Sequence, residues 1–149
     1  MILFLVHHGD AVDPAIDPRR PLSSAGREAV ERLAGEAAVR GVRPEVVWHS
    51  GKLRAKQTAE TFWRACNALA EFSATRDLQP GDPPGWIRDR LRAEPRDLLI
   101  AGHFPHLPRL LALLVGGSQD AAGSFPPHGV VALQTSDDGE TWTELWRLS

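Results

Sequence analysis

Histidines stand at the ends of the short apolar segments from which this chain would build a sheet. His7 and His8 come directly after the apolar run at residues 2–6, and His49 and His103 follow two further runs of the same kind. Continuous apolar runs of this length are typical of strands that are buried on both faces. In open α/β sheets, ligands bind beyond the carboxyl ends of such strands. The sequence therefore predicts a histidine-rich site at one edge of a sheet.

The residue types around these histidines suit the transfer of a phosphoryl group. A neutral imidazole can attack phosphorus and form a phosphohistidine, provided that a hydrogen bond fixes its other ring nitrogen. Gly9, directly after His8, allows a tight turn and a close approach by substrate. Arg54 is expected in the first turn of a helix, where its guanidinium and the helix N-terminus can face one anion. His103, if protonated, would add a donor and a charge on the opposite side.

Strands that alternate with helices indicate how these residues are positioned. Apolar residues at helical spacing predict one helix that Ser23 or Ser24 caps and that runs to about Arg40, and a second from Lys52 to about Ala70. The other expected elements are helices at 86–93 and 107–115, strands at 2–6, 46–48, 72–75, 98–101, 130–135 and 141–148, and loops at 13–22, 79–85 and 116–129. This order predicts one α/β domain over residues 1–149, a three-layer α/β/α sandwich with a mostly parallel central sheet.

Length and composition exclude several other classes of protein. The 149 residues carry a net charge of −2 and are 42% apolar and 24% charged, close to an average globular domain. A net charge of −2 does not favour binding to nucleic acid. No apolar run is long enough to span a membrane or act as a signal, so the cytoplasm is the expected compartment. Cys66 is expected to be a small buried hydrophobe. His106, at the start of a helix, is expected to be exposed.

Four segments together resemble the histidine phosphatase superfamily, and within it the small SixA-type phosphohistidine phosphatases. In chain order the segments are Val6-His7-His8-Gly9-Asp10-Ala11, Arg20-Pro21-Leu22-Ser23-Ser24-Ala25-Gly26-Arg27, Ser50-Gly51-Lys52-Leu53-Arg54-Ala55-Lys56-Gln57-Thr58-Ala59-Glu60 and Gly102-His103-Phe104-Pro105. The third and fourth segments are the more specific. The match covers residues 1 to about 115, and Arg20 matches a family position near the mouth of the site.

The resemblance implies a phosphoglycerate mutase-like fold, a metal-independent phosphatase without a cofactor, and a role for each matching residue. His8 would be the phosphorylated nucleophile, Arg54 would hold the phosphate, and His103 would stabilise the transferring group. His7 departs from the family pattern, which has arginine there; a histidine is shorter, has no fork and is largely neutral at pH 7. Its help to the phosphate is therefore expected to need protonation. Asp82 is a weak candidate for the acid that protonates the leaving group.

Two other interpretations remain beside that of a phosphatase acting on a phosphohistidine protein or a small phosphate ester. A metal site could draw ligands from His7, His8, Asp10, His49 and His103, although no pair of them shows a dedicated metal-binding spacing. A degenerate family member could bind phosphorylated partners without efficient turnover, because His7 replaces the arginine. A phosphatase assay with and without chelator separates the three interpretations.

Overall fold

The central sheet has six strands, and β1 (Ile2–His7) lies in its interior between β4 and β5. The computed structural model describes residues 1–116 and 125–149, so residues 117–124 of the expected loop lie outside the described residues. The other strands are β2 (Val46–His49), β3 (Glu71–Ala74), β4 (Leu98–Gly102), β5 (Val130–Gln134) and β6 (Thr143–Leu148). Their order is β3-β2-β4-β1-β5-β6; the first four are parallel, and β5 runs antiparallel to both β1 and β6. The expected mostly parallel sheet with a C-terminal hairpin is confirmed.

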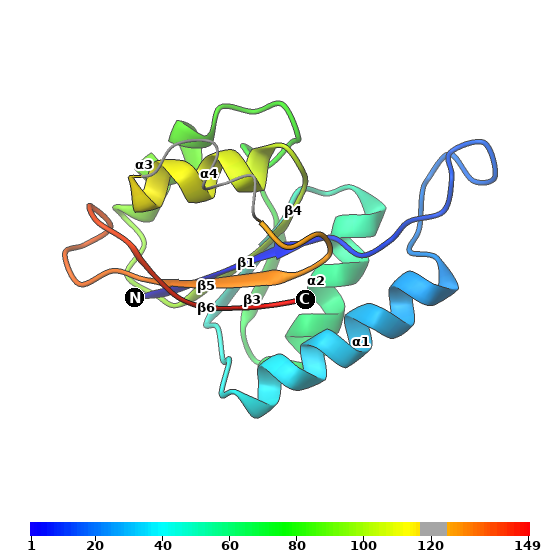
Figure 1. Cartoon of the computed structure of the whole chain (residues 1–149), viewed down its shortest axis with the longest axis horizontal. Coiled ribbons are helices and arrows are strands. Elements are labelled where there is room, and N and C mark those ends of the chain that lie inside the picture. The colour runs from blue at the N-terminus through cyan, green and yellow to red at the C-terminus, as the bar shows by residue number, and fades with distance from the viewer. Residues whose placement is uncertain (117–124) are drawn as a thin grey trace.

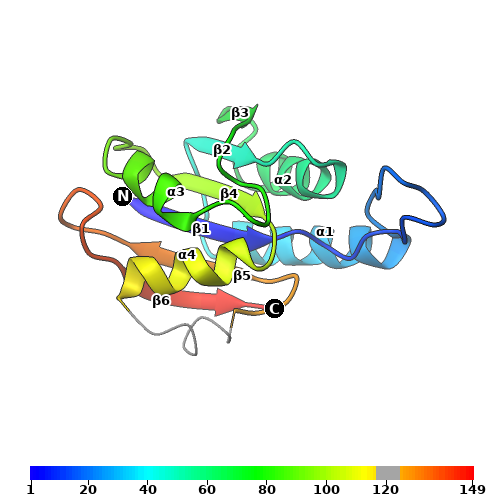
Figure 2. The same ribbon diagram turned by 90° about the horizontal axis from the view of Figure 1, so that it is seen from above.

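Helices cover both faces of this sheet, as Figures 1 and 2 show. One face carries α1 (Ser24–Val39) and α2 (Leu53–Cys66), and the other carries α3 (Pro84–Leu91) and α4 (His106–Val115). Side chains of β1 alternate between the two faces: Phe4 and Val6 pack in the core with α1 and α2, whereas Leu3 and Leu5 pack in the core with α3 and α4. Because both faces are covered, β1 is apolar throughout. Of the helices described, none is long and apolar enough to cross a membrane.

The predicted helix bounds hold approximately, with two differences. α2 ends at Cys66 rather than near Ala70, because Asn67 has extended backbone (φ −166°) and its Nδ2 donates to the carbonyl of Pro44 at 2.8 Å. α3 begins at Pro84, inside the expected loop, since proline suits the first turn of a helix. Neither difference moves a predicted site residue.

His106 is buried, so the expectation that it is exposed was wrong. It is the first residue of α4 and its exposed fraction is 0%. The apolar side of α4 faces the sheet, and His106 lies on that side together with Leu107 and Leu110. Burial lowers the pKa of His106, although Asp82 and Asp77 oppose the shift. His106 is therefore a neutral core residue under physiological conditions.

The register of the strands brings four chain segments to one edge of the sheet. His7 is aligned with Gly102 of β4, and His49 is aligned with Ala101. β5 begins at this same edge, where Val130 is aligned with Val6, because it runs antiparallel to β1. The ends of β1, β2 and β4 and the start of β5 therefore surround one site.

Candidate active site

His8 is held in the tautomer that a nucleophile requires. Its Nδ1 lies 2.7 Å from the carbonyl of Gly9, and a carbonyl can only accept, so Nδ1 carries the hydrogen and Nε2 keeps a lone pair. Burial lowers the pKa of His8 to about 4; the bond to Gly9 opposes this shift, and Arg54, His128 and Arg20 add to it. His8 is therefore neutral at pH 7, with Nε2 free to attack.

Gly9 and Thr58 fix the turn that follows His8. The Gly9 N–H donates to Thr58 Oγ1 at 3.1 Å, and Thr58 Oγ1 donates to the carbonyl of Arg54 at 2.8 Å. A Cβ on Gly9 would lie 2.5 Å from Val30 Cγ2, so only glycine fits between β1 and α1 here. This chain of contacts ties the His8 turn to the first turn of α2, which carries Arg54.

Arg54 and Arg20 place positive charge beside His8. Arg54 lies in the first turn of α2, half-buried, and its Nε is buried without a hydrogen-bond partner among the described residues. Burial and then the charge of Arg20 lower the pKa of Arg54. Arg20 has a left-handed backbone (φ 49°) and donates from Nε to the carbonyl of Val12 at 3.1 Å. These two guanidiniums repel each other and lie beside a helix N-terminus. An oxyanion bound between them would relieve that repulsion.

His103 completes the site on the side of β4. Its ring centroid lies 5.1 Å from that of His8, and its Nε2 lies 2.6 Å from Ser50 Oγ. Burial lowers the pKa of His103 to about 3, with further lowering by His8, Arg54, Lys52 and His7. The expectation that His103 brings a charge is therefore wrong for the free protein.

A neutral His103 can still be a donor. The Ser50 oxygen already accepts from the Lys52 N–H at 3.3 Å, which leaves the Ser50 hydrogen free to go to His103 Nε2. In that arrangement the proton of His103 is on Nδ1, which is buried and has no partner in the described part of the chain. A buried N–H without a partner costs free energy unless a ligand satisfies it.

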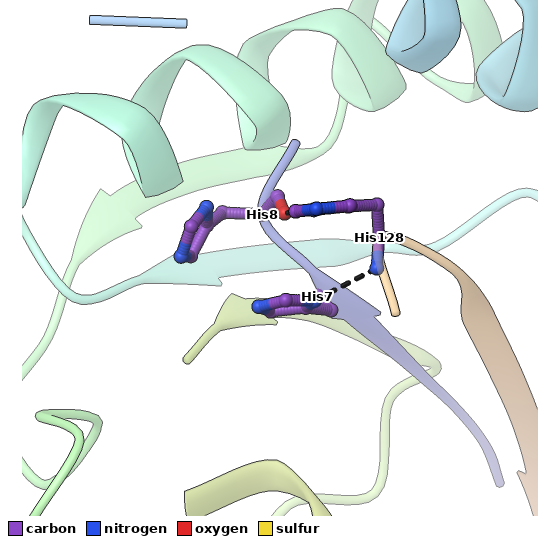
Figure 3. A group of neighbouring side chains, drawn as sticks. All are labelled: His7, His8 and His128. Carbon is purple, nitrogen blue, oxygen red and sulfur yellow. Dashed lines mark hydrogen bonds between the residues drawn. The ribbon is translucent and has the colours of Figure 1, made fainter. Parts of the chain in front are cut away.

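His7 is fixed by hydrogen bonding and by stacking. Its Nδ1 accepts from the backbone N–H of His128 at 2.7 Å, as the dashed line in Figure 3 marks, so the ring proton must be on Nε2. Its ring lies parallel to that of Phe104 at 3.9 Å between centroids and to that of His128 at 4.8 Å, both with an interplanar angle of 9°. Burial lowers the pKa of His7 to about 3, and His8 and His128 lower it further. His7 can therefore donate from Nε2 while neutral, and the expectation that its help needs protonation was wrong.

His128 belongs to the site, and the sequence reasoning missed it. Its Nδ1 lies 2.7 Å from the carbonyl of His8, to which it must donate, and its backbone is left-handed (φ 56°). The residue falls in a segment expected to be loop. The available signal was topological: a residue just before a strand antiparallel to β1 must lie near the carboxyl end of β1.

Three other candidate residues each accept a hydrogen bond within a nearby turn or helix end. His49 accepts from the Gly51 N–H at 3.0 Å and packs on the ring of Phe72, so it shapes the turn before α2. The Asp10 carboxylate accepts from Ser23 Oγ at 2.7 Å, next to the N-terminus of α1. Asp82 accepts from the backbone N–H of Gln79 at 2.9 Å in the loop before α3. Its role as an acid stays a prediction.

One nitrogen from each ring of His7, His8 and His128 lies within 4.8 Å of the others, a spacing that could suit a metal ion. The hydrogen bonds oppose that use. Coordination by His7 Nε2 would move its proton to Nδ1, which already faces the N–H of His128. The nearby Arg54 and Arg20 also disfavour a cation. The cluster is better matched to an oxyanion.

Comparison with known proteins agrees with this geometry. No family model matches the chain. Phosphohistidine phosphatase SixA of Escherichia coli K12 is 29% identical, over 100% of this chain and 94% of that protein. The structure of the protein histidine phosphatase SixA complexed with tungstate has 28% identity, covers 100% of this chain and 97% of the other, and superposes with a TM-score of 0.88.

A more distant structure shares the fold. The phosphoglycerate mutase of Plasmodium falciparum is 15% identical and superposes with a TM-score of 0.75, covering 97% of this chain and 88% of that one. The whole sheet and both helical layers are therefore common to these proteins. Over its full length the chain is thus similar to a phosphohistidine phosphatase, and it has the fold of the SixA and phosphoglycerate mutase structures.

Proposed function

We propose that this protein is a phosphatase that works through a phosphohistidine intermediate on His8, without a metal ion. The observation that carries the proposal is the tautomer of His8: its Nδ1 hydrogen is engaged by Gly9, so its Nε2 lone pair is available at neutral pH. Arg54, Arg20 and the neutral donors His7 and His103 then offer the phosphoryl oxygens what a transferring group needs.

In the first step, His8 Nε2 attacks the phosphorus atom of the substrate. The N–P bond forms while the bond to the leaving group breaks, and the leaving group departs with that electron pair and takes a proton. When the substrate is a phosphohistidine whose ring is protonated on its other nitrogen, the substrate imidazole departs as a neutral ring, so this step makes little demand on an acid. Charge on the phosphoryl oxygens is stabilised by Arg54, the N-terminus of α2 and His7.

In the second step, water attacks the phosphorus of phosphorylated His8. The N–P bond breaks, its electron pair returns to Nε2, and the water proton passes to solvent or to the released phosphate. The bond from His8 Nδ1 to Gly9 keeps the ring in one orientation through both steps.

A phosphohistidine on a protein is the substrate class that the proposal favours, with small phosphate esters second. His8 is half-buried and His128 is exposed, so the reacting edge opens at the surface of the molecule. An open edge can receive a side chain that projects from another protein. One similar SixA protein is named a phosphohistidine phosphatase and another a protein histidine phosphatase, which supports the same class here.

The test is to trap the intermediate. Wild-type protein incubated with a ³²P-labelled phosphohistidine protein should yield an acid-labile, base-stable label, and His8→Ala should yield none and lose turnover. Label that persists in His8→Ala would assign the nucleophile to another residue. Stable binding of the phosphoprotein by wild type, with neither label nor phosphate release, would favour the binding-only interpretation instead.

A further inference from the structure

We infer that His128 is a further substrate-binding residue, which together with His7 holds the oxygens of the phosphoryl group opposite Arg54. The inference rests on the proposed function, which identifies the ligand as a phosphoryl group. It assigns a role to a residue that lies outside the four sequence segments that resemble the histidine phosphatases.

The ring of His128 is held over the site by its own backbone and by His8. Nδ1 donates to the carbonyl of His8 at 2.7 Å, while the backbone N–H donates to His7 Nδ1 at 2.7 Å. Figure 3 shows the ring of His128 above the ring of His7, with the ring of His8 beside them. With Nδ1 engaged, Nε2 is the one ring nitrogen of His128 left for a ligand.

The spacing of the rings fits one tetrahedral anion. One ring nitrogen from each of His7, His8 and His128 lies within 4.8 Å of the other two. Two nitrogens at that separation can both lie about 2.9 Å from one oxygen, which is a normal hydrogen-bond length. The rings of His7 and His128 are stacked with their centroids 4.8 Å apart, so the remaining ring nitrogen of each can serve the same anion, in place of the two N–H groups of one guanidinium fork.

His128 can donate from Nε2 only as an imidazolium, because its Nδ1 hydrogen is already used. Among residues 1–116 and 125–149, the titratable side chains whose rings contact it are His7 and His8 of β1, and Phe104 reaches the stack from the segment after β4. Arg54 of α2 and Arg20 of the loop before α1 act on the neighbouring His8. None of these described groups brings a negative charge, so a bound phosphoryl dianion would be the anionic partner of an imidazolium at this position. Binding of the anion should therefore be coupled to uptake of a proton.

Two substitutions separate the two nitrogens of His128. His128→Asn keeps an amide near the Nδ1 position, tolerates the left-handed backbone and removes Nε2. His128→Gln places a neutral N–H near the Nε2 position and gives up the Nδ1 contact. The backbone N–H that binds His7 is present in both variants, and thermal unfolding confirms that each is folded.

The measurements are binding of tungstate by calorimetry and kcat/KM on a phosphohistidine protein, each from pH 6 to 8. Wild type should bind tungstate more tightly at pH 6 than at pH 8. His128→Asn should weaken tungstate binding and kcat/KM about ten-fold or more at pH 6 and lose that pH dependence. His128→Gln should bind tungstate better than His128→Asn, with no dependence on pH.

Equal tungstate affinity and an unchanged pH dependence in both variants would overturn the inference. So would losses that follow only a lowered melting temperature, with the pH dependence intact, because that result would make His128 a structural residue. Tungstate binding does not depend on turnover. The two results can therefore differ. If wild type never carries ³²P on His8 but His128→Asn still binds tungstate more weakly, the proposed function is rejected and the inference about His128 stands.

Discussion

The two ends of the central sheet treat their charged groups in opposite ways. At the amino-terminal end, Arg96 lies 2.9 Å from Glu94 and 3.0 Å from Glu71, and its hydrogen bonds lower the pKa of Glu94. At the carboxyl-terminal end, none of the described carboxylates lies within ion-pair distance of Arg54, and the nearby Arg20 lowers its pKa instead.

Buried nitrogens at the carboxyl-terminal end extend this contrast. The carboxyl-terminal end holds buried ring and guanidinium nitrogens without partners, on His103 and Arg54. Groups of this kind destabilise a fold unless something binds to them. Guanidiniums without a carboxylate partner among the described residues, beside the neutral His8, indicate a site suited to an anion, whereas the paired charges at the other end are typical of ordinary surface.

The largest expected effect comes from removing the unpaired guanidinium. Arg54→Ala should lower kcat/KM about 100-fold, because a charge-assisted contact to the phosphoryl group is worth roughly 1.5–3 kcal/mol and Arg54 can make two. Its melting temperature should change by only a few degrees, since the charge is not paired in the free protein. Steady-state kinetics and thermal unfolding measure the two effects.

Arg96→Ala is the matched control for the other end of the sheet. Its ion pairs are exposed, and such pairs contribute little to stability. Activity should stay at the wild-type level. Unfolding of Arg54→Ala would show that Arg54 has a structural role. A loss of activity in Arg96→Ala comparable to that in Arg54→Ala would show that the two ends of the sheet do not differ in function.

The second prediction concerns the acid limb of the pH profile. With a pKa of about 4 in the free protein, His8 should stay neutral and active at pH 5, where an ordinary histidine would be only about 3% neutral. The profile of kcat/KM should therefore fall near pH 4. At pH 5, kcat/KM should be about 30-fold higher than it would be if His8 had the ordinary histidine pKa of 6.5. An acid limb near pH 6.5 would show that His8 is not shielded in this way.

The same shifts act on stability. The pKa values of His7, His8 and His103 are lowered to between about 3 and 4, so the unfolded chain binds more protons than the folded one below pH 6.5. Their contribution is fully present above that pH and is lost progressively as the pH falls toward 3. Circular dichroism at each pH separates loss of fold from loss of catalysis.

The smallest expected effect is that of a chelator. EDTA should leave phosphatase turnover unchanged, because the proposed positive charge comes from Arg54, Arg20 and the N-terminus of α2. Measuring turnover before and after chelation, with added zinc or manganese, tests this. Activity that appears only with added metal would assign the cluster of His7, His8 and His128 to a cation. The carboxyl-terminal end of the sheet would then be a metal site rather than an anion site.

Much of the fold and part of the site follow from local patterns in the sequence. Apolar runs and helical spacing predicted the main elements of the sheet and helices, since burial of both faces leaves a direct mark on residue type. The strand ends then predicted that His7, His8 and His103 meet. His49 met the same condition, but its ring nitrogen is used by the turn that follows it. A strand end fixes the place of a residue, not the direction of its side chain.

What the sequence did not reveal depends on contacts between distant segments. His128 reaches His7 across 121 positions of the chain, through the pairing of β5 with β1. The protonation states of His7 and His103 follow from burial and from hydrogen bonds to His128 and Ser50, which spacing cannot show. The same holds for the buried position of His106.

The stack of Phe104, His7 and His128 joins three separate parts of the chain at the reacting edge. Phe104 follows β4, His7 ends β1, and His128 comes just before the C-terminal hairpin. The recognisable segments all lie in the first 105 residues or so, yet His128, which contacts His7 and His8, comes just before the hairpin. A fragment or a chimera that keeps every signature segment and exchanges the hairpin with the residue before it would therefore keep the proposed nucleophile, His8, but lose the contacts that His128 makes beside it. A transfer of this site to another protein should therefore include β5 and the residue His128 that comes just before it.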